Sequence, residues 1–402
     1  MINKIFSSGS KNNKSDFYVE YAPNDSNKIV IDINSKNNFL FGSKINDLCL
    51  QVCKDLNIVG GTFLINDTGG QYFTLQARIE ATVKSAWPNI KSESLPEFKK
   101  HSNYKSKKDR FRRSRLYIPG NQAKLMLNAG IHKPDGIILD LEDSVSQSEK
   151  HSARLIVRNA LRYLNFFNAE RMVRINQGEL GLTDLESIIP HNVHLILIPK
   201  VEDASELIKI DKKIQNISQI CGRKEPVYLM PIIESASGIL NVFEIANASK
   251  NNAAIAIGLE DYTADIGVER TNEGKESLFA RSQLINAARS ANIQAIDTVF
   301  SDVADENSLR KSVKEAKKMG FDGKGCIHPR QIKPIHEEFA PSTNQIEKAK
   351  NIVLAFDEAK ERGLGVVSLG SKMIDPPVVK RAQKTIQIAI SMNILSKSWK
   401  KN

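Results

Sequence analysis

Eight short apolar runs after Phe111 limit the possible folds of this 402-residue chain more than any other feature. Longer stretches with apolar residues at helical spacing separate the runs, so strand and helix alternate along the chain. Repeated strand–helix units predict a parallel sheet covered by helices, and eight of them suffice to close a (β/α)8 barrel. The runs are 115–118, 136–141, 172–175, 194–198, 227–233, 253–257, 295–300 and 325–327.

Many of these runs end at charged or polar residues. In a (β/α)8 barrel the active site forms where the strands end, because the loops converge there while side chains fill the interior. Strand ends also reach water, so a purely structural role remains the alternative for each residue. Together at one mouth, they are typical of a catalytic site. The residues are Asp140, Glu142, Asp143, Arg174, Asn176, Lys200, Glu234, Glu260, Asp261 and His328.

The composition is typical of a globular protein and gives little support for a nucleic-acid or membrane partner. The chain is 41% hydrophobic, which fits a barrel with a small companion domain. Its net charge of +11 could indicate a nucleic-acid partner, but basic residues concentrate in 99–115 rather than being interleaved with aromatic residues on a patterned surface, so we interpret them as a solvated linker. Residues 1–14 lack an apolar signal core, and no apolar run approaches membrane-spanning length. Four cysteines form no disulfide framework or metal half-sites. We expect a cytoplasmic protein without a membrane or nucleic-acid partner.

Three parts are expected along the chain. Residues 1–87 predict a small α+β domain, because strand-like and helical patterns alternate there. Residues 88–112 contain prolines, serines and the basic run, and predict a flexible basic linker that lets the flanking domains move. Residues 113–402 predict the barrel and a C-terminal helical segment. In the first part we expect strands at 17–21 and 29–33 that pair across a turn, further strands at 62–65 and 72–75, and helices at 41–56 and from Ala77.

The strand ends predict a metal site. Glu234 and Asp261 end adjacent strands, and two carboxylates with open positions suit Mg²⁺, which keeps waters and binds substrate oxygens. Helix capping is the alternative. Arg174 offers a fork for a substrate carboxylate, or a structural ion pair with Glu142 or Asp143. Lys200 could form a Schiff base, but a divalent metal makes an imine unnecessary, so we favour a structural or electrostatic role.

Seven segments along the chain match the motifs of a known family. They are RSRLYIPG (113–120), LDLED (139–143), VRIN (173–176), IES (233–235), EDY (260–262), GKGCIHP (323–329) and KMID (372–375). Through these segments, the region from Arg113 to about Ala389 resembles the citrate lyase beta subunit and its malyl-CoA and citramalyl-CoA lyase relatives, in the HpcH/HpaI aldolase/citrate lyase family. The resemblance implies that Glu234 and Asp261 hold Mg²⁺, that Arg174 binds the oxo acid, and that Asp375 serves as acid or base in a neighbouring subunit of a homo-oligomer.

This gives a set of candidate site residues. The catalytic candidates are Asp375, Arg174 and Glu142, and the substrate-binding candidates are Arg113, Arg174 and Asn176. Without the resemblance, Asp375 beside two prolines would pass for a turn residue.

The N-terminal domain resembles the citrate lyase acyl carrier (gamma) subunit, at 21–23, 67–69 and 77–78. That family carries a phosphoribosyl-dephospho-CoA arm on a serine two residues before an aspartate. Here the segment reads Lys14-Ser15-Asp16, with Lys14 in the expected serine position. Ser15 is the first candidate for the arm and Ser10 the second. An ordinary surface serine is the alternative.

The expected function is a Mg²⁺-dependent lyase that cleaves a citryl thioester, on the carrier or on CoA, to oxaloacetate and an acetyl thioester. A separate acyl-exchange (alpha) subunit is a possible partner. One rival is a malyl-CoA or citramalyl-CoA lyase with an inactive carrier domain. Another is a noncatalytic assembly protein whose N-terminal domain docks partner subunits.

Overall fold

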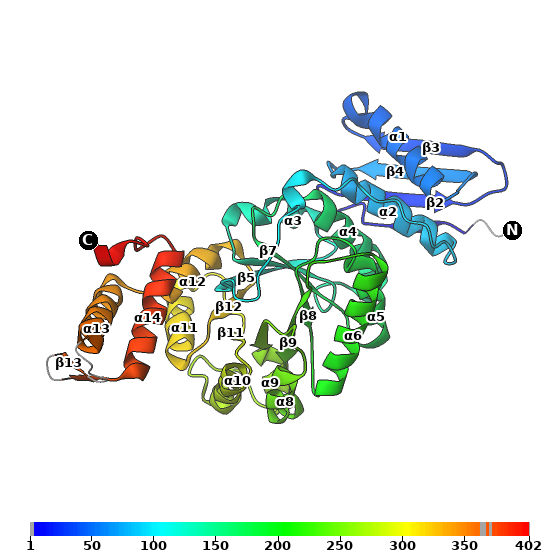
Figure 1. The fold of residues 1–402 in the computed structure, drawn as a ribbon. Coiled ribbons are helices and arrows are strands. Elements are labelled where there is room, and N and C mark those ends of the chain that lie inside the picture. Colours follow the sequence, from blue (N-terminus) through cyan, green and yellow to red (C-terminus); the bar gives the residue numbers. More distant parts are fainter. Residues whose placement is uncertain (1–3, 362–366, 370–371, 402) are drawn as a thin grey trace. The chain divides into compact units, whose positions relative to one another are not determined.

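A closed barrel of eight parallel strands dominates the computed structural model, which describes residues 4–361, 367–369 and 372–401. Each apolar run contributes one strand, which confirms the predicted (β/α)8 barrel (Figure 1). The strands pair in the order β10-β11-β12-β5-β6-β7-β8-β9. They are β5 (Ser114–Pro119), β6 (Gly136–Asp140), β7 (Glu170–Arg174), β8 (Leu195–Ile198), β9 (Tyr228–Ile233), β10 (Ala254–Ile257), β11 (Gln294–Asp297) and β12 (Gly323–Cys326).

Helices cover the outside of the barrel, and apolar side chains such as Met172, Met230 and Ile296 pack inside it. Every parallel strand therefore has its carboxyl end at the same mouth. None of the helices in the described ranges is long and apolar enough to cross a membrane. The helices are α3 (Ala123–Ala129), α4 (Lys150–Tyr163), α5 (Gly178–Ile188), α6 (Ala204–Ile220), α7 (Ala236–Leu240), α8 (Val242–Asn247), α9 (Leu259–Asp265), α10 (Leu278–Ser290) and α11 (Glu306–Met319).

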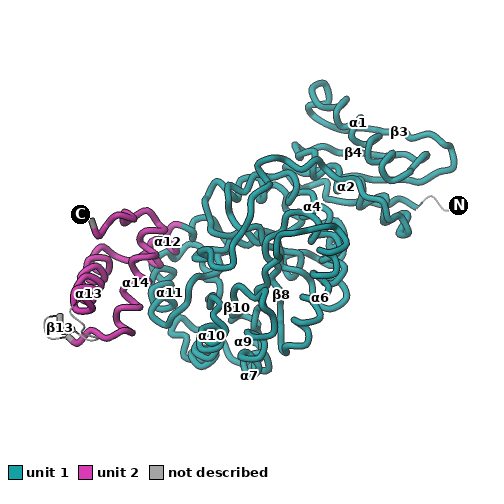
Figure 2. Tube along the Cα trace, viewed as in Figure 1, with its two compact units in different colours: residues 1–332 teal, residues 333–402 magenta. Residues whose placement is uncertain are grey.

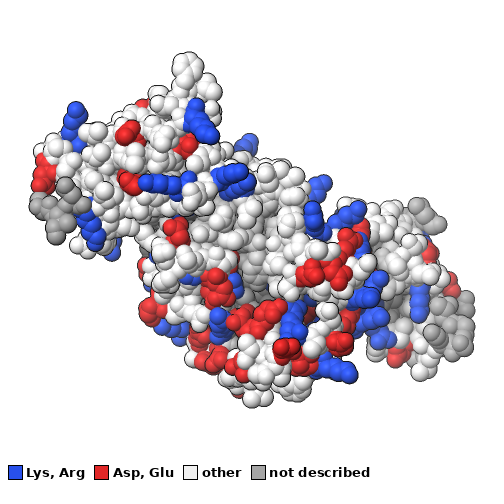
Figure 3. All heavy atoms as spheres, turned by 180° about the vertical axis from the view of Figure 1, so that it is seen from behind, with Lys and Arg blue, Asp and Glu red and all other residues white. Residues whose placement is uncertain are grey.

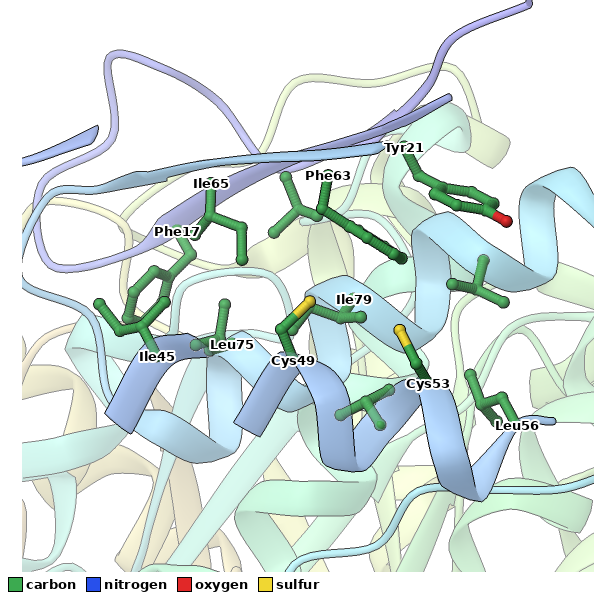
Figure 4. Close-up of a cluster of buried hydrophobic side chains, with 13 residues drawn as sticks. Phe17, Tyr21, Ile45, Cys49, Cys53, Leu56, Phe63, Ile65, Leu75 and Ile79 are labelled. Carbon is green, nitrogen blue, oxygen red and sulfur yellow. The ribbon is translucent and has the colours of Figure 1, made fainter. Parts of the chain in front are cut away.

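The N-terminal domain is a four-stranded sheet covered by two helices, as predicted for a small α+β domain. Its strands pair in the order β1-β2-β4-β3. Figure 4 shows its core, where side chains from the sheet meet Ile45, Cys49 and Cys53 of α1 and Leu75 and Ile79 of α2. The elements are β1 (Phe6–Ser8), β2 (Phe17–Ala22), β3 (Ile29–Ser35), α1 (Asn38–Asp55), β4 (Gly61–Asp67) and α2 (Tyr72–Ala86).

Two local predictions in this domain are wrong. Residues 72–75 form the first turn of α2 rather than a strand. The helix is buried from Phe73 to Val83, so its sequence lacks the polar face that identifies a surface helix. The strands predicted at 17–21 and 29–33 do not pair with each other. Instead β4 lies between them, antiparallel to β2 and parallel to β3.

Helix α2 also packs against α4 of the barrel, through two buried arginines that each reach a carboxylate across the contact. Arg78 of α2 binds Glu149, just before α4, at 3.0 Å. In the opposite direction, Arg158 of α4 binds Glu80 of α2 at 2.7 Å. Neither arginine side chain is exposed. The Asn159 amide adds a hydrogen bond to the carbonyl of Phe73 (3.0 Å). This contact therefore joins the N-terminal domain and the barrel through matched charges.

Residues 88–112, expected to be a flexible linker, lie against the barrel. Arg112 is fully buried and binds Glu170, the first residue of β7, through two hydrogen bonds of 2.7 and 2.8 Å. The carbonyl of Tyr104 accepts a hydrogen bond of 2.7 Å from His194, just before β8. Some of the basic side chains that suggested a solvated linker, Arg110 and Arg112 among them, are thus hydrogen-bonded at the amino-terminal end of the barrel. On the face in Figure 3, positive and negative side chains are interspersed.

Residues 333–402 form a second compact unit (Figure 2). Its own core joins Ile352 and Val353 of one helix to Val379, Ala382 and Ile386 of another. This unit accounts for the predicted C-terminal helical segment. Its elements are most of α12 (Ile332–Phe339), then α13 (Thr343–Glu361), β13 (Val367–Leu369), β14 (Lys372–Ile374) and α14 (Pro376–Ser391).

Candidate active site

A cavity of about 370 Å³ opens at the carboxyl ends of the barrel strands. Its volume lies in the range typical of small-molecule sites. The lining combines apolar strand residues with acids and two arginines. The polar and aromatic members are Arg115, Tyr117, Asp140, Asp143, Ser144, Arg174, Glu234, Glu260, Asp261, Asp297 and Thr298.

Arg174, the last residue of β7, is surrounded by carboxylates. Its Nε and Nη2 bind the two oxygens of Asp140 at 2.6 and 2.7 Å, in a bidentate pair. Its Nη1 lies 2.9 Å from Glu142 and 3.6 Å from Asp143. Burial alone would raise the pKa of Asp140, but the hydrogen bonds and the charge of Arg174 lower it below its usual value. The ion pair that sequence left open for Arg174 is therefore present, with Asp140 as the main partner.

Lys200 connects this network to the predicted metal ligands. Its ammonium lies 3.4 Å from Glu142 and 3.7 Å from Asp261. Burial alone would lower the pKa of Lys200, but the neighbouring carboxylates raise it above its usual value. The side chain therefore stays charged and is a poor Schiff-base nucleophile. Its backbone has a left-handed φ of 51°, and its N–H donates to Glu234 Oε2 at 3.0 Å. A residue held in this conformation often supports a functional site.

Glu234 is nearly buried, and its environment opposes its charge. Burial, and then the charge of Asp261, raise its pKa to about 7. Its carboxylate fits against Gly258, where an added Cβ would meet Oε1 at 2.2 Å. Two neighbouring carboxylates with unfavourable burial suit a divalent cation, and hard oxygen donors suit Mg²⁺. Within the described ranges no three His, Cys, Asp or Glu side chains are placed to hold one metal ion, so water and substrate oxygens would complete the coordination by Glu234 and Asp261.

Three other predicted residues, Asn176, Arg113 and Ser15, belong to the same compact unit but are not among the residues that line this cavity. Asn176 donates to Asp184 of α5 through its backbone and side chain, both at 2.8 Å. Arg113 precedes β5 and binds Asp135, which precedes β6. Because the strands start there, Arg113 stands at the amino-terminal end and not with the other candidates.

Asp375 caps α14 of the second unit, where its side chain accepts from the N–H of Val378 at 3.2 Å. Ser15 is partly exposed with a left-handed φ of 60°, and its N–H donates to the carbonyl of Thr68. The next residue, Asp16, is buried and binds Arg78 at 2.7 Å.

Sequence reasoning missed three contributors to the site. Asp140 was noted only as a strand end, yet it is the main partner of Arg174. Tyr117 and Arg115 lie inside an apolar run, and only their alternation along β5 could have shown that both face the interior.

Comparisons with known proteins agree with this geometry. Residues 113–329 match the HpcH/HpaI aldolase/citrate lyase family, and residues 11–86 match the malonate decarboxylase delta subunit. The chain is 43% identical to the citrate lyase subunit beta of Haemophilus influenzae over 285 residues, which are 70% of this chain and 98% of that protein. It is 32% identical to the mitochondrial citramalyl-CoA lyase of Mus musculus, over 77% of this chain and 95% of that one.

A solved relative has the same barrel. It is CitE from Mycobacterium tuberculosis in complex with magnesium, acetoacetate and coenzyme A, with a TM-score of 0.59 and 26% identity over 69% of this chain and 98% of that chain. The expected resemblance to a carrier-like domain followed by a lyase barrel is confirmed by both family matches. The family match spans more than half of the chain and the beta subunit aligns over nearly its whole length, so this protein belongs to the HpcH/HpaI aldolase/citrate lyase family.

Proposed function

We propose that this protein is a Mg²⁺-dependent carbon–carbon lyase that cleaves a citryl thioester to oxaloacetate and an acetyl thioester, in the cytoplasm. The pairing of Glu234 and Asp261 in a cavity next to Arg174 and Lys200 carries this proposal. The similarity to citrate lyase beta subunits, and to CitE crystallised with magnesium, supports it.

In this proposal Glu234 and Asp261 would hold the metal, and its charge would stabilise the hydroxyl oxygen that becomes the ketone. A base takes the hydroxyl proton, the bond to the thioester α-carbon breaks, and its electron pair forms the thioester enolate. An acid then protonates that carbon. Arg174 and Lys200 keep positive charge beside the anionic substrate. Glu142 contacts both cations, so it orients them and is a candidate for proton transfer.

The direct test measures 2-oxo acid release from citryl-CoA, citramalyl-CoA and malyl-CoA, each with Mg²⁺ and with a chelator. We expect metal-dependent oxaloacetate from the citryl thioester. Glu234→Gln should abolish it, whereas Glu202→Gln, at an exposed acid, should not. Unchanged activity of Glu234→Gln would refute the metal site.

Asp375 is proposed as the acid or base in a neighbouring subunit's site. Asp375→Asn and Glu234→Gln should each be inactive alone. If the site is shared, mixed oligomers contain some sites with both native residues, so mixing the unfolded variants and refolding them together should restore part of the activity. Lack of recovery in oligomers shown to be mixed would contradict a shared site.

We also propose that Ser15 carries the phosphoribosyl-dephospho-CoA arm and that a separate alpha subunit exchanges its acyl group. Intact mass after expression with the arm-attaching enzymes should show an adduct that Ser15→Ala removes and Ser10→Ala keeps. Persistence of the adduct in Ser15→Ala would refute this site. Co-purification of a tagged alpha subunit with the chain tests the partner, and its absence from the eluate would argue against a stable complex.

The second candidate function is a lyase for citramalyl-CoA or malyl-CoA with an inactive carrier domain. Similarity to the mitochondrial citramalyl-CoA lyase, and Lys14 in the position where the serine is expected, favour it. Preferential release of pyruvate or glyoxylate, with no adduct on the chain, would identify this function.

A further inference from the structure

Arg115 is a buried cation without a counterion. It is the second residue of β5 and only 1% exposed. Its Nη1 contacts the sulfur of Met230 at 3.1 Å, and its Nη2 lies 3.5 Å from the carbonyl of Asp297. Its Nε has no hydrogen-bond partner, and no ion pair of Arg115 occurs within the described ranges. Burial lowers its pKa, which shows how poorly the apolar interior solvates the charge.

The other fully buried arginines are satisfied. Arg78, Arg112 and Arg158 each bind at least one carboxylate. Arg171 donates to the backbone carbonyls of Asn192 and Tyr104. A buried charge without partners is costly, so a protein that retains one in a cavity has a group ready for an anionic ligand.

Arg115 lines the same cavity as Glu234 and Arg174. The fork of Arg174 is already occupied by Asp140 and Glu142. The carboxylate of Asp297 forms ion pairs with Lys324 and Arg281. Among the cations lining this cavity, the guanidinium open to a carboxylate from the ligand is therefore that of Arg115.

We propose that Arg115 binds the second carboxylate of a 2-oxo dicarboxylic acid. This rests on the proposed function, in which the first carboxylate and the ketone lie near Glu234 and Asp261. The product of citryl thioester cleavage has a carboxylate at each end, whereas pyruvate and glyoxylate lack the distal one. A charge-assisted hydrogen bond in a dry cavity is strong, so Arg115 selects the citryl thioester over the citramalyl and malyl thioesters.

Arg115→Met tests this, because methionine is unbranched and suits the apolar neighbours of the side chain. Calorimetric titration of the Mg²⁺-loaded protein should show oxaloacetate affinity about 10- to 100-fold weaker in the variant, the range expected for losing charged hydrogen bonds. Pyruvate affinity should change by less than about threefold. Arg115→Lys, which keeps a charge, should lie between the two for oxaloacetate. Thermal unfolding should show that Arg115→Met is at least as stable as the native chain.

Equal weakening of oxaloacetate and pyruvate would overturn the assignment, and so would unchanged binding of both. A large loss of stability in Arg115→Met would also overturn it, since the guanidinium would then serve the fold. The proposed function fails in a different way, when the native chain releases no oxaloacetate from a citryl thioester. If the native chain releases no oxaloacetate but still binds it through Arg115, the anion-binding role of Arg115 is supported and the proposed reaction is refuted.

Discussion

Replacing Glu234 by glutamine should stabilise the metal-free protein above neutral pH. In the folded chain, burial and then the charge of Asp261 raise the pKa of Glu234 from 4.5 to about 7. The folded state holds this proton more tightly than the unfolded state, so the contribution of the group to stability is present at low pH. It is lost as the pH rises from about 4.5 through about 7. Glutamine carries no charge at any of these pH values, and its oxygen can still accept from Lys200.

The size of the effect follows from the pKa difference between the two states. A rise from 4.5 to about 7 corresponds to about 3 kcal/mol of unfolding free energy at pH 8, and to less than about 1 kcal/mol at pH 5. The side chain is 7% exposed, so solvent screening reduces this little. Glu234→Gln should recover most of that amount at pH 8.

Urea unfolding in the presence of EDTA measures the difference. The native chain, Glu234→Gln and the exposed control Glu202→Gln are compared at pH 5 and pH 8. The control should match the native chain at both pH values. A Glu234→Gln variant that is no more stable than the native chain at pH 8, or that gains the same amount at pH 5, would refute the reasoning.

Three further outcomes are expected. Because the proton on Glu234 must leave before Mg²⁺ binds, calorimetry should show affinity falling toward tenfold per pH unit below about 7, and a pH-independent affinity would contradict this. Arg158→Ala leaves the buried Glu80 with Lys84 and the backbone N–H of Ser94, and should cost about 3–5 kcal/mol in urea unfolding. Adding Glu80→Gln should restore part of this loss, and unchanged stability of Arg158→Ala would contradict the prediction. Asp297→Asn leaves Lys324 without its carboxylate and should cost a similar amount, about 3–5 kcal/mol, by the same assay; unchanged unfolding would show that the pair is dispensable.

The barrel could be predicted from sequence because each buried strand leaves a continuous apolar run, and the strand order follows from parallel pairing. The same reasoning brought Arg174, Glu234 and Asp261 to one mouth, since each stands at the carboxyl end of a run. Arg113 comes directly before its strand, so the chain direction already places it at the amino-terminal end of the barrel. Our expectation that Arg113 binds substrate did not take this position into account.

Other features depend on partners distant in sequence. In the sequence, Arg112 looks like part of a basic linker, because its partner Glu170, at the start of β7, is distant along the chain. The helical nature of 72–75 is hidden because α2 is covered by its own sheet and by α4 at once, so no polar face marks its period. The isolation of Arg115 is likewise a property of the folded interior, because sequence does not show which acids are already engaged.

Because both modules belong to one chain, their stoichiometry is fixed, and the contact between α2 and α4 fixes where they meet. Separate carrier and lyase chains meet by mass action, so their encounter depends on the concentration of each. Here a covalent connection supplies one carrier-like domain for each barrel, and the pairs Arg78–Glu149 and Arg158–Glu80 hold that domain at one position on the barrel. Dilution leaves this ratio unchanged. Regulation by unequal expression of the two modules is thereby removed, and whatever controls the supply of one controls the other in equal number.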